Sequence, residues 1–244
     1  MHDWFNIIKA GSALSAKALQ ELREVGFVVI PGPVPPGELA QLAAVYDSEV
    51  ETANPEDLSV GSTTIRVNDF VNRGPEFDEI YIYKPVLEAC CYIIDRPFKL
   101  RTMISRTVPP HAYAQEIHAD FKRAPDGYPM IGFIFMVDEF RPDNGATRFI
   151  PGSHKWPSVP DHLIKYTLGG YEGEVPAYGL AGSMIVFNGS VWHGHSANLS
   201  DAPRRSIQGA FIRREEMIRG NSPVRMRPET LARIGPLAKY LLDV

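Results

Sequence analysis

The stretch His118-Ala-Asp120-Phe places a histidine and an aspartate two positions apart in the chain. On an extended strand, side chains at this spacing project from the same face, about 6.5 to 7 Å apart along the strand axis, so both can contact one metal ion. His193 follows an Asn-Gly turn signal and could supply a second imidazole from a neighbouring strand. Two neutral imidazoles and one carboxylate suit a divalent iron ion and leave three coordination positions for other ligands. The pattern predicts an enzyme with a non-haem iron centre.

An arginine follows the second histidine on the next predicted strand. Arg204 lies eleven residues after His193, and its guanidinium is a planar fork that can bind a carboxylate through two parallel hydrogen bonds. Ser206 shares the parity of Arg204 on that strand, so both side chains can face the same interior as His193. Arg204 is therefore a candidate clamp for a carboxylate co-substrate.

Composition and charge narrow the class of protein. The 244 residues are 44% hydrophobic and 22% charged, which is ordinary for a globular protein with a core. The net charge of −4 gives no electrostatic reason to expect a nucleic acid or an acidic membrane as partner. A basic run near the end is interrupted by two glutamates, and we expect it to be solvated; its members are Arg213, Arg214, Arg219, Arg225 and Arg227.

The two cysteines, Cys90 and Cys91, are adjacent in the sequence. A disulfide between neighbouring cysteines is strained, so we expect two free thiols in a reducing cytoplasm. The N-terminus shows no basic segment followed by an apolar one, and the longest strongly apolar run, 131–137, is too short to span a bilayer. These features predict a soluble, cytoplasmic protein.

Hydrophobic spacing and turn signals predict helices first and short strands afterwards. Ser15 is a candidate N-cap for an amphipathic helix, and a buried strand follows at 27–30. Helical spacing recurs at 37–51 and 85–94, whereas most of 52–77 is left without an element. Apolar or alternating runs separated by turn residues predict strands at 99–108, 131–137, 147–150, 183–187, 191–195 and 206–213.

This order of elements predicts a mainly β (α+β) protein: a β-sandwich or jelly roll with N-terminal helices packed against it. No repeat or low-complexity linker marks a second domain, so we expect a single domain over residues 1–244. Within it, the helical buttress would cover about 1–96, the jelly-roll core about 97–213 and a C-terminal extension 214–244.

Four stretches together resemble the phytanoyl-CoA dioxygenase family of Fe(II)/2-oxoglutarate-dependent oxygenases. The resemblance runs from about residue 15 to residue 213, and its two most specific parts are the Asn-Gly to Pro-Gly-Ser-His stretch and the spacing from histidine through Asn-Leu-Ser to arginine. The four stretches are Gly26-Phe-Val-Val-Ile-Pro-Gly, His118-Ala-Asp120-Phe, Asp143-Asn-Gly-Ala-Thr-Arg-Phe-Ile-Pro-Gly-Ser-His154-Lys and Trp192-His193-Gly-His-Ser-Ala-Asn198-Leu-Ser200-Asp-Ala-Pro-Arg204.

The resemblance implies a double-stranded β-helix, or cupin-like jelly roll, in which His118, Asp120 and His193 hold Fe(II). It also implies that Arg204 grips the distal carboxylate of 2-oxoglutarate and that O2 is the other co-substrate. The family's spacing from metal histidine to arginine fits His193 and does not fit His195, so the ligand is assigned to His193.

Three further residues are candidates for the neighbourhood of the co-substrate. His195 would be a neighbour of the co-substrate or of the metal ligands. Thr147 and Ser206 could form hydrogen bonds with the co-substrate, although each is equally interpretable as an ordinary strand residue. The loops at 121–130 and 155–178 are expected to form pocket walls and a lid.

As a member of this family, the protein would hydroxylate, or otherwise oxidise at a C–H bond, a small molecule while 2-oxoglutarate is converted to succinate. Asp120 argues against a halogenase, whose related sites replace the acid with a small residue. The alternative is a cupin-like metal-binding protein on the same barrel, either a 2-oxoglutarate-independent dioxygenase or isomerase or a non-catalytic binder; Arg204 is the feature against it. Neither the primary substrate nor the oligomeric state can be predicted from these residues.

Overall fold

The computed structural model describes residues 3–157, 171–216 and 226–244, and within them two antiparallel sheets face each other. The strands of the large sheet, in spatial order, are β1 (Phe27–Pro31), β8 (Ser183–Asn188), β5 (Met130–Met136), β10 (Arg204–Arg213), β4 (Phe98–Val108), β3 (Ile65–Val67) and β2 (Leu58–Val60). The small sheet contains β7 (Val175–Pro176), β6 (Thr147–Phe149) and β9 (His193–His195). The predicted jelly roll is confirmed.

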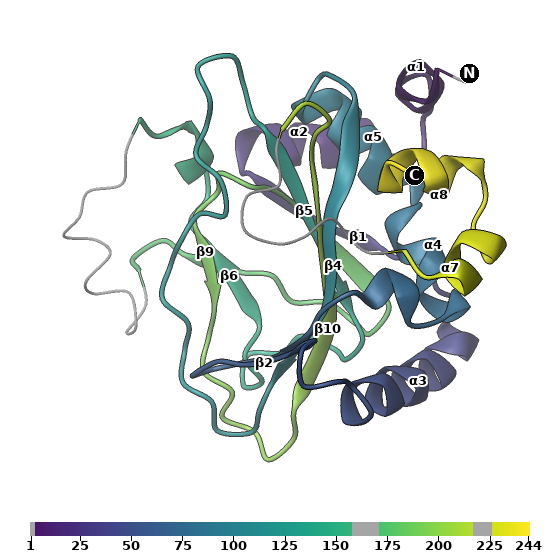
Figure 1. Cartoon of the computed structure of the whole chain (residues 1–244). Coiled ribbons are helices and arrows are strands. Elements are labelled where there is room, and N and C mark those ends of the chain that lie inside the picture. Colours follow the sequence, from purple (N-terminus) through teal and green to yellow (C-terminus); the bar gives the residue numbers. More distant parts are fainter. Residues whose placement is uncertain (1–2, 158–170, 217–225) are drawn as a thin grey trace.

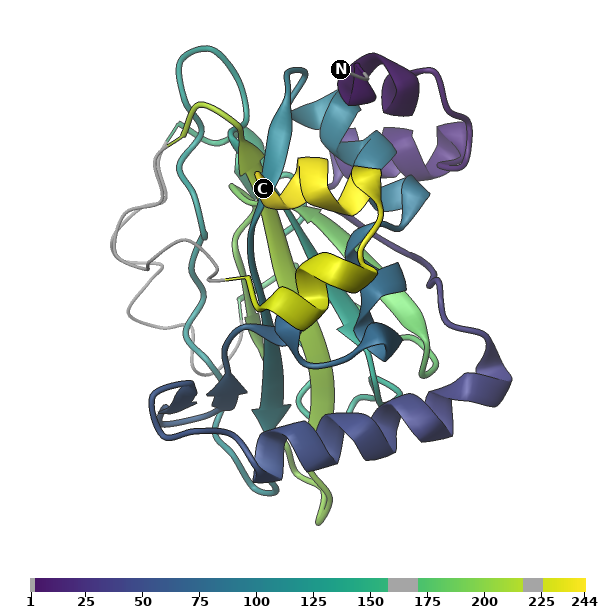
Figure 2. The same cartoon turned by 45° about the vertical axis from the view of Figure 1, so that its right-hand side comes forward.

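Helices cover the face of the large sheet that points away from the small sheet (Figures 1 and 2). The α-helices are α1 (Trp4–Lys9), α2 (Ala16–Glu24), α3 (Leu39–Glu51), α4 (Asp78–Tyr81), α5 (Lys84–Ile93), α7 (Pro228–Arg233) and α8 (Pro236–Leu242). Short 3-10 helices are η1 (Pro36–Glu38), η2 (Phe70–Asn72), η3 (Pro75–Phe77) and η4 (Ser153–Lys155). Ser15 caps α2 as predicted, because its side chain accepts a hydrogen bond from the Ala18 amide at 3.2 Å.

The alternation of side chains along β10 separates the core from the interior of the barrel. Ile207 and Phe211 pack in the hydrophobic core between the large sheet and the helices. Arg204 and Gln208 face the opposite side and line a cavity between the two sheets. The strand thus presents apolar residues to the helices and polar residues to the interior, and the interior is where a site can form.

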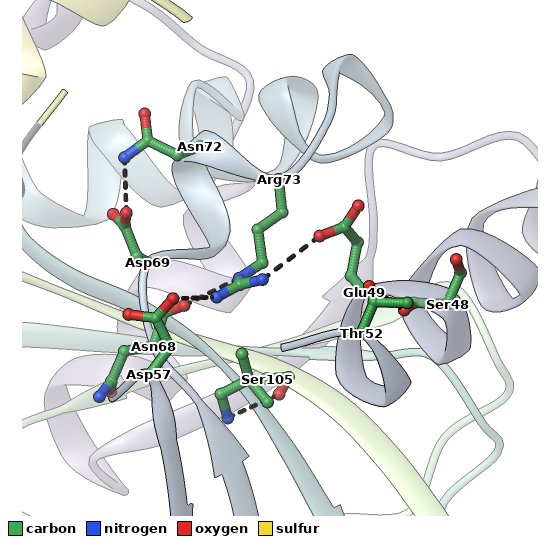
Figure 3. Close-up of polar contacts among 10 residues, drawn as sticks. Ser48, Glu49, Thr52, Asp57, Asn68, Asp69, Asn72, Arg73 and Ser105 are labelled. Atoms are coloured by element: carbon green, nitrogen blue, oxygen red, sulfur yellow. Dashed lines mark hydrogen bonds and ion pairs between the residues drawn. The ribbon is translucent and has the colours of Figure 1, made fainter. Parts of the chain in front are cut away.

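Two short strands lie in the segment for which no element was predicted. β2 and β3 form a hairpin at the edge of the large sheet, with β3 paired to β4. Arg73 fastens this hairpin to α3, because its guanidinium donates to Asn68 O at 3.0 Å, Asp57 Oδ2 at 2.8 Å and Glu49 Oε2 at 3.3 Å (Figure 3). No apolar pattern marks β2 in the sequence, because all three of its residues are exposed.

The basic run near the C-terminus was expected to be solvated, and for Arg213 and Arg214 this prediction is wrong. Arg213 is only 4% exposed and donates to Asp126, and Arg214 donates to Tyr240 O at 2.9 Å. α8 lies against the same core, in which Leu241 is fully buried. Arg219 and Arg225 lie outside the described residues.

Two smaller expectations concern the cysteines and the membrane. Cys90 and Cys91 are both buried and free, as predicted. Within the described ranges, no helix is long and apolar enough to cross a membrane.

Candidate metal centre

His118, Asp120 and His193 converge at one end of the small sheet. The backbones of His118 and His193 form an antiparallel bridge, with N–O distances of 2.9 and 2.8 Å. Asp120 Oδ1 lies 3.6 Å from Nε2 of His118, and Oδ2 lies 3.7 Å from Nε2 of His193. The three potential ligand atoms all lie within 4.8 Å of one another, and the part of the chain that the structure describes holds no other such group. The backbone bridge thus brings together the three residues that the sequence singled out.

Backbone carbonyls fix the orientation of both imidazoles. Nδ1 of His118 lies 3.1 Å from Glu116 O, and Nδ1 of His193 lies 3.0 Å from Val191 O. Because a carbonyl only accepts, Nδ1 carries the proton in each ring, and the lone pair of Nε2 points toward Asp120. This is the tautomer that a metal ligand needs.

Aromatic packing holds the buried histidine in place. Phe149 stacks on the His193 ring at a centroid distance of 5.5 Å, and Phe187 contacts it at 4.9 Å. Phe187 in turn lies against Gly132 of β5, where any Cβ would overlap the phenyl ring. A glycine on β5 therefore makes room for the ring that supports His193.

The charge states around neutral pH also suit a metal. Burial lowers the pKa of His193 to about 4, against the opposing attraction of Asp120. Burial alone would raise the pKa of Asp120, but His193, His118 and Arg106 outweigh it and bring that pKa down to about 2. At pH 7 the site therefore offers a neutral His193 and an ionised Asp120, both with free lone pairs.

Arg204 is buried, and the described residues offer it no acidic partner. It is 1% exposed, and its guanidinium donates to Ser206 Oγ at 3.0 Å and to Gly145 O at 2.9 Å, while Nε has no partner. The group lies 4.1 Å above the Phe140 ring. Burial lowers the pKa of Arg204 to about 9, with a further contribution from Arg106. A buried cation held by a hydroxyl and a carbonyl is a strong candidate to bind an anion.

The remaining predicted residues take different places. Thr147 and His195 are cross-strand partners, and both line the cavity. His195 lies outside the triangle of ligands, because its Nε2 contacts Thr63 at 3.1 Å and its Nδ1 contacts Ser196 O at 2.8 Å. Ser206 accepts a hydrogen bond from the Arg204 side chain and does not itself line the cavity.

A cavity of about 340 Å³, its open mouth included, extends from Asp120 and His193 of the ligand triangle to Arg204. Three of its polar residues were not predicted. Arg106 and Gln208 lie on strands β4 and β10, where a polar side chain is usually taken to face solvent, and Gln115 lies between strands, where no pattern marks it. Its lining residues are Arg106, Gln115, Asp120, Ile134, Thr147, Phe187, His193, Gly194, His195, Arg204 and Gln208.

The expected pocket loops are placed only in part. In the loop at 121–130, Phe121 packs against Met130, Ala210 and Ile212, and none of these residues lines the cavity. Of the loop at 155–178, residues 158–170 lie outside the described part of the chain.

The sequence is similar to those of known dioxygenases. Residues 22–206 match the family model described as phytanoyl-CoA dioxygenase. Dioxygenase sphC of Aspergillus fumigatus is 27% identical over 214 residues, which cover 78% of this chain and 56% of sphC. Multifunctional dioxygenase ausE of Emericella nidulans is 30% identical over 215 residues, which cover 79% of this chain and 71% of ausE. This chain thus spans little more than half of the first relative.

Solved structures show the same fold. HygX of Streptomyces hygroscopicus, with nickel and 2-oxoglutarate bound, aligns with a TM-score of 0.69 and 16% identity, covering 87% of this chain and 94% of HygX. HygX has also been solved with hygromycin B bound. The non-heme alpha ketoglutarate dependent carbocyclase SnoK from nogalamycin biosynthesis aligns with a TM-score of 0.66 and 18% identity, covering 83% and 85% of the two chains.

Proposed function

This chain belongs to the phytanoyl-CoA dioxygenase family, and on that premise we propose that it is an Fe(II)/2-oxoglutarate-dependent dioxygenase acting on a small molecule. It hydroxylates, or otherwise oxidises at a C–H bond, this substrate while O2 and 2-oxoglutarate are consumed and succinate and CO2 are formed. The observation that carries the proposal is the triangle of His118, Asp120 and His193 beside a buried arginine without an acidic partner.

The donor set fits Fe(II). His118, Asp120 and His193 would hold the metal through two imidazole nitrogens and one carboxylate oxygen, and bound iron would supply the centre at which O2 is activated. Asp120 contributes the negative charge that a divalent metal requires. The carbonyls of Glu116 and Val191 keep the protons on Nδ1, so that Nε2 of each histidine is available before the metal arrives.

Arg204 is proposed to bind the distal carboxylate of 2-oxoglutarate. Ser206 and Gly145 O hold the guanidinium at one edge, and Phe140 supports its face, so its position is fixed in advance. Thr147 and His195 border the same cavity and contribute polar atoms to its wall. Because the cavity walls are protein, the co-substrate is shielded from water, which strengthens its ionic contact with Arg204.

A small-molecule substrate is proposed from the comparisons. HygX has been solved with hygromycin B bound, and SnoK comes from nogalamycin biosynthesis. Proteins of similar fold therefore act in the chemistry of small molecules. We also propose that the whole chain works as one domain, because Ile234, Ala238 and Leu241 at its C-terminal end pack in the same core as the large sheet.

The test is formation of succinate from 2-oxoglutarate by the purified protein, with Fe(II) and O2 present, across a panel of candidate small molecules. We expect succinate formation that requires iron and is lost in Asp120→Ala. Asp143→Ala removes an exposed carboxylate of the Arg141–Asp143 pair and serves as the matched control, with activity unchanged. Iron-loaded protein that forms no succinate with any compound would favour the 2-oxoglutarate-independent or non-catalytic alternative.

A further inference from the structure

A second arginine lies in the same cavity as Arg204. Arg106 of β4 stands directly opposite Ser206 of β10, so its side chain projects beside the hydroxyl that supports Arg204. Its Nη2 donates to Gln115 Oε1 at 2.6 Å and its Nη1 donates to Gln208 Oε1 at 3.3 Å. Two neutral amides therefore hold this guanidinium in place without neutralising it.

The surroundings of Arg106 leave its charge uncompensated. Its Nε is buried without a partner. Burial lowers the pKa of Arg106 to about 10, and the nearby Arg66 lowers it further, against the attraction of Asp120. Arg106 also lowers the pKa of Arg204, so the two cations repel each other across one cavity. An anion bound between the two guanidinium groups would offset the free-energy cost of burying each charge and would reduce their mutual repulsion.

The charges of the cavity match a dianion. Its lining holds two guanidinium groups, those of Arg106 and Arg204, and one carboxylate, that of Asp120. In the proposed function, the carboxylate of Asp120 binds the metal. The two arginines then remain for the two carboxylates of 2-oxoglutarate. Arg106 is the one on the side of the metal ligands, because it donates to the side chain of Gln115, whose backbone N–H donates to His195 O, two residues after His193.

We propose that Arg106 is a second carboxylate-binding residue, which holds the carboxylate nearer the metal ligands while Arg204 holds the distal one. The cavity thereby recognises both ends of one short dicarboxylate, partly independently of the chelate formed by the 2-oxo group. This assignment rests on the proposed function, and it gives Gln115 and Gln208 the task of positioning Arg106.

The experiment measures binding of glutarate, which has both carboxylates of 2-oxoglutarate but no oxo group, and of pentanoate, in which a methyl group replaces one carboxylate. Full-length Fe(II)-loaded protein, kept anaerobic, is titrated by calorimetry. We expect the wild type to bind glutarate more tightly than pentanoate. Arg106→Gln is expected to weaken glutarate binding about 10- to 100-fold, the range for a lost charge-assisted contact.

A second variant keeps the test decisive if Arg106→Gln fails to fold. Gln208→Glu keeps Arg106 and gives it an internal carboxylate partner, so glutarate affinity is expected to fall although no cation is removed. Arg141→Gln removes one exposed positive charge that does not line the cavity, and this variant is expected to bind glutarate like the wild type.

Three results decide between the claims. Weaker glutarate binding in both Arg106→Gln and Gln208→Glu, with thermal unfolding near that of the wild type, supports the assignment. Unchanged binding in both, while Arg204→Gln loses it, would overturn the role of Arg106 and leave the proposed function standing. Unchanged binding in all three variants would remove the carboxylate clamp itself and with it the support for 2-oxoglutarate as co-substrate.

Discussion

At the scale of single residues, the centre depends on side chains that hold the ligands as much as on the ligands. His193 is fixed by the carbonyl of Val191 at 3.0 Å and by the rings of Phe149 and Phe187. Gly132 has no side chain, and this leaves the space that the Phe187 ring occupies. Gly132, which has no side chain to bind a metal, thus controls the position of a proposed ligand.

Gly132→Ala is the corresponding prediction. Its methyl group would overlap the Phe187 ring, so the ring must shift away from its place beside His193. We expect a loss of about 1 to 3 kcal/mol in the free energy of unfolding, as for overpacked cores, together with weaker metal binding. Denaturant unfolding and metal titration measure the two effects. Gly37→Ala, where a methyl group meets no atom within 4 Å, is the control; equal effects of both substitutions would contradict the account.

The same scale shows what the sequence could reveal about the site. The spacing within His118-Ala-Asp120 and from His193 to Arg204 predicted side chains that the structure brings together: Asp120, His193 and Arg204 line one cavity, and His118 completes the ligand triangle. Arg106 gave no such signal, because nothing in its sequence neighbourhood indicates that its strand position faces a closed interior. Its role follows from its register opposite Ser206, which only the folded sheet defines.

At the scale of elements, the β2–β3 hairpin contacts the site at one end, and Arg73 joins it to the helices at the other. The connection between its strands carries Thr63, whose hydroxyl lies 3.1 Å from Nε2 of His195. At the other end, Arg73 binds Asp57 and Glu49 (Figure 3). Arg73 therefore joins both chain ends of the hairpin to α3, in addition to the pairing of β3 with β4.

Arg73→Ala is expected to loosen this hairpin. The arginine side chain is 4% exposed and its partners 28% and 29%, so removing it should cost about 2 to 3 kcal/mol of stability, less than for a fully buried pair. Hydrogen exchange should become faster in residues 57–67 than elsewhere in the large sheet. Arg141→Ala, which breaks an exposed pair, should change neither quantity; uniform exchange in both variants would show that Arg73 does not hold the hairpin.

Long elements were predictable and short exposed ones were not. The alternating runs predicted strands close to β4 and β5, and the runs at 147–150, 183–187 and 206–213 lie within or beside observed strands. β2 and β3 have three residues each, too few for a periodic pattern. Arg213 became buried because the loop carrying Asp126 covers it, a tertiary contact that local composition does not encode.

At the scale of the whole molecule, the buried histidines link stability to pH. The pKa of His193 is about 4 in the folded state, below its ordinary value of 6.5. The unfolded chain therefore binds more protons between these values, and stability falls as the pH is lowered from 6.5 toward 4. His195, with a pKa lowered to about 3 by burial, acts in the same direction.

We predict that His193→Gln flattens this pH dependence in metal-free protein. The free energy of unfolding of the wild type should fall by on the order of 2 to 3 kcal/mol more than that of the variant between pH 7 and pH 4. Chemical unfolding at a series of pH values measures both slopes. Parallel curves would mean that His193 is not buried as a neutral imidazole.

The most direct measurement is an anaerobic titration of the Fe(II)-loaded protein with 2-oxoglutarate, following the metal-to-ligand charge-transfer absorption of the chelate. The triangle of His118, Asp120 and His193 beside Arg204 predicts a saturable band in the wild type. In Arg204→Ala, saturation should require about 10- to 100-fold more 2-oxoglutarate. Bound iron without any band, or a band that saturates equally in both proteins, would contradict the co-substrate site proposed for this chain.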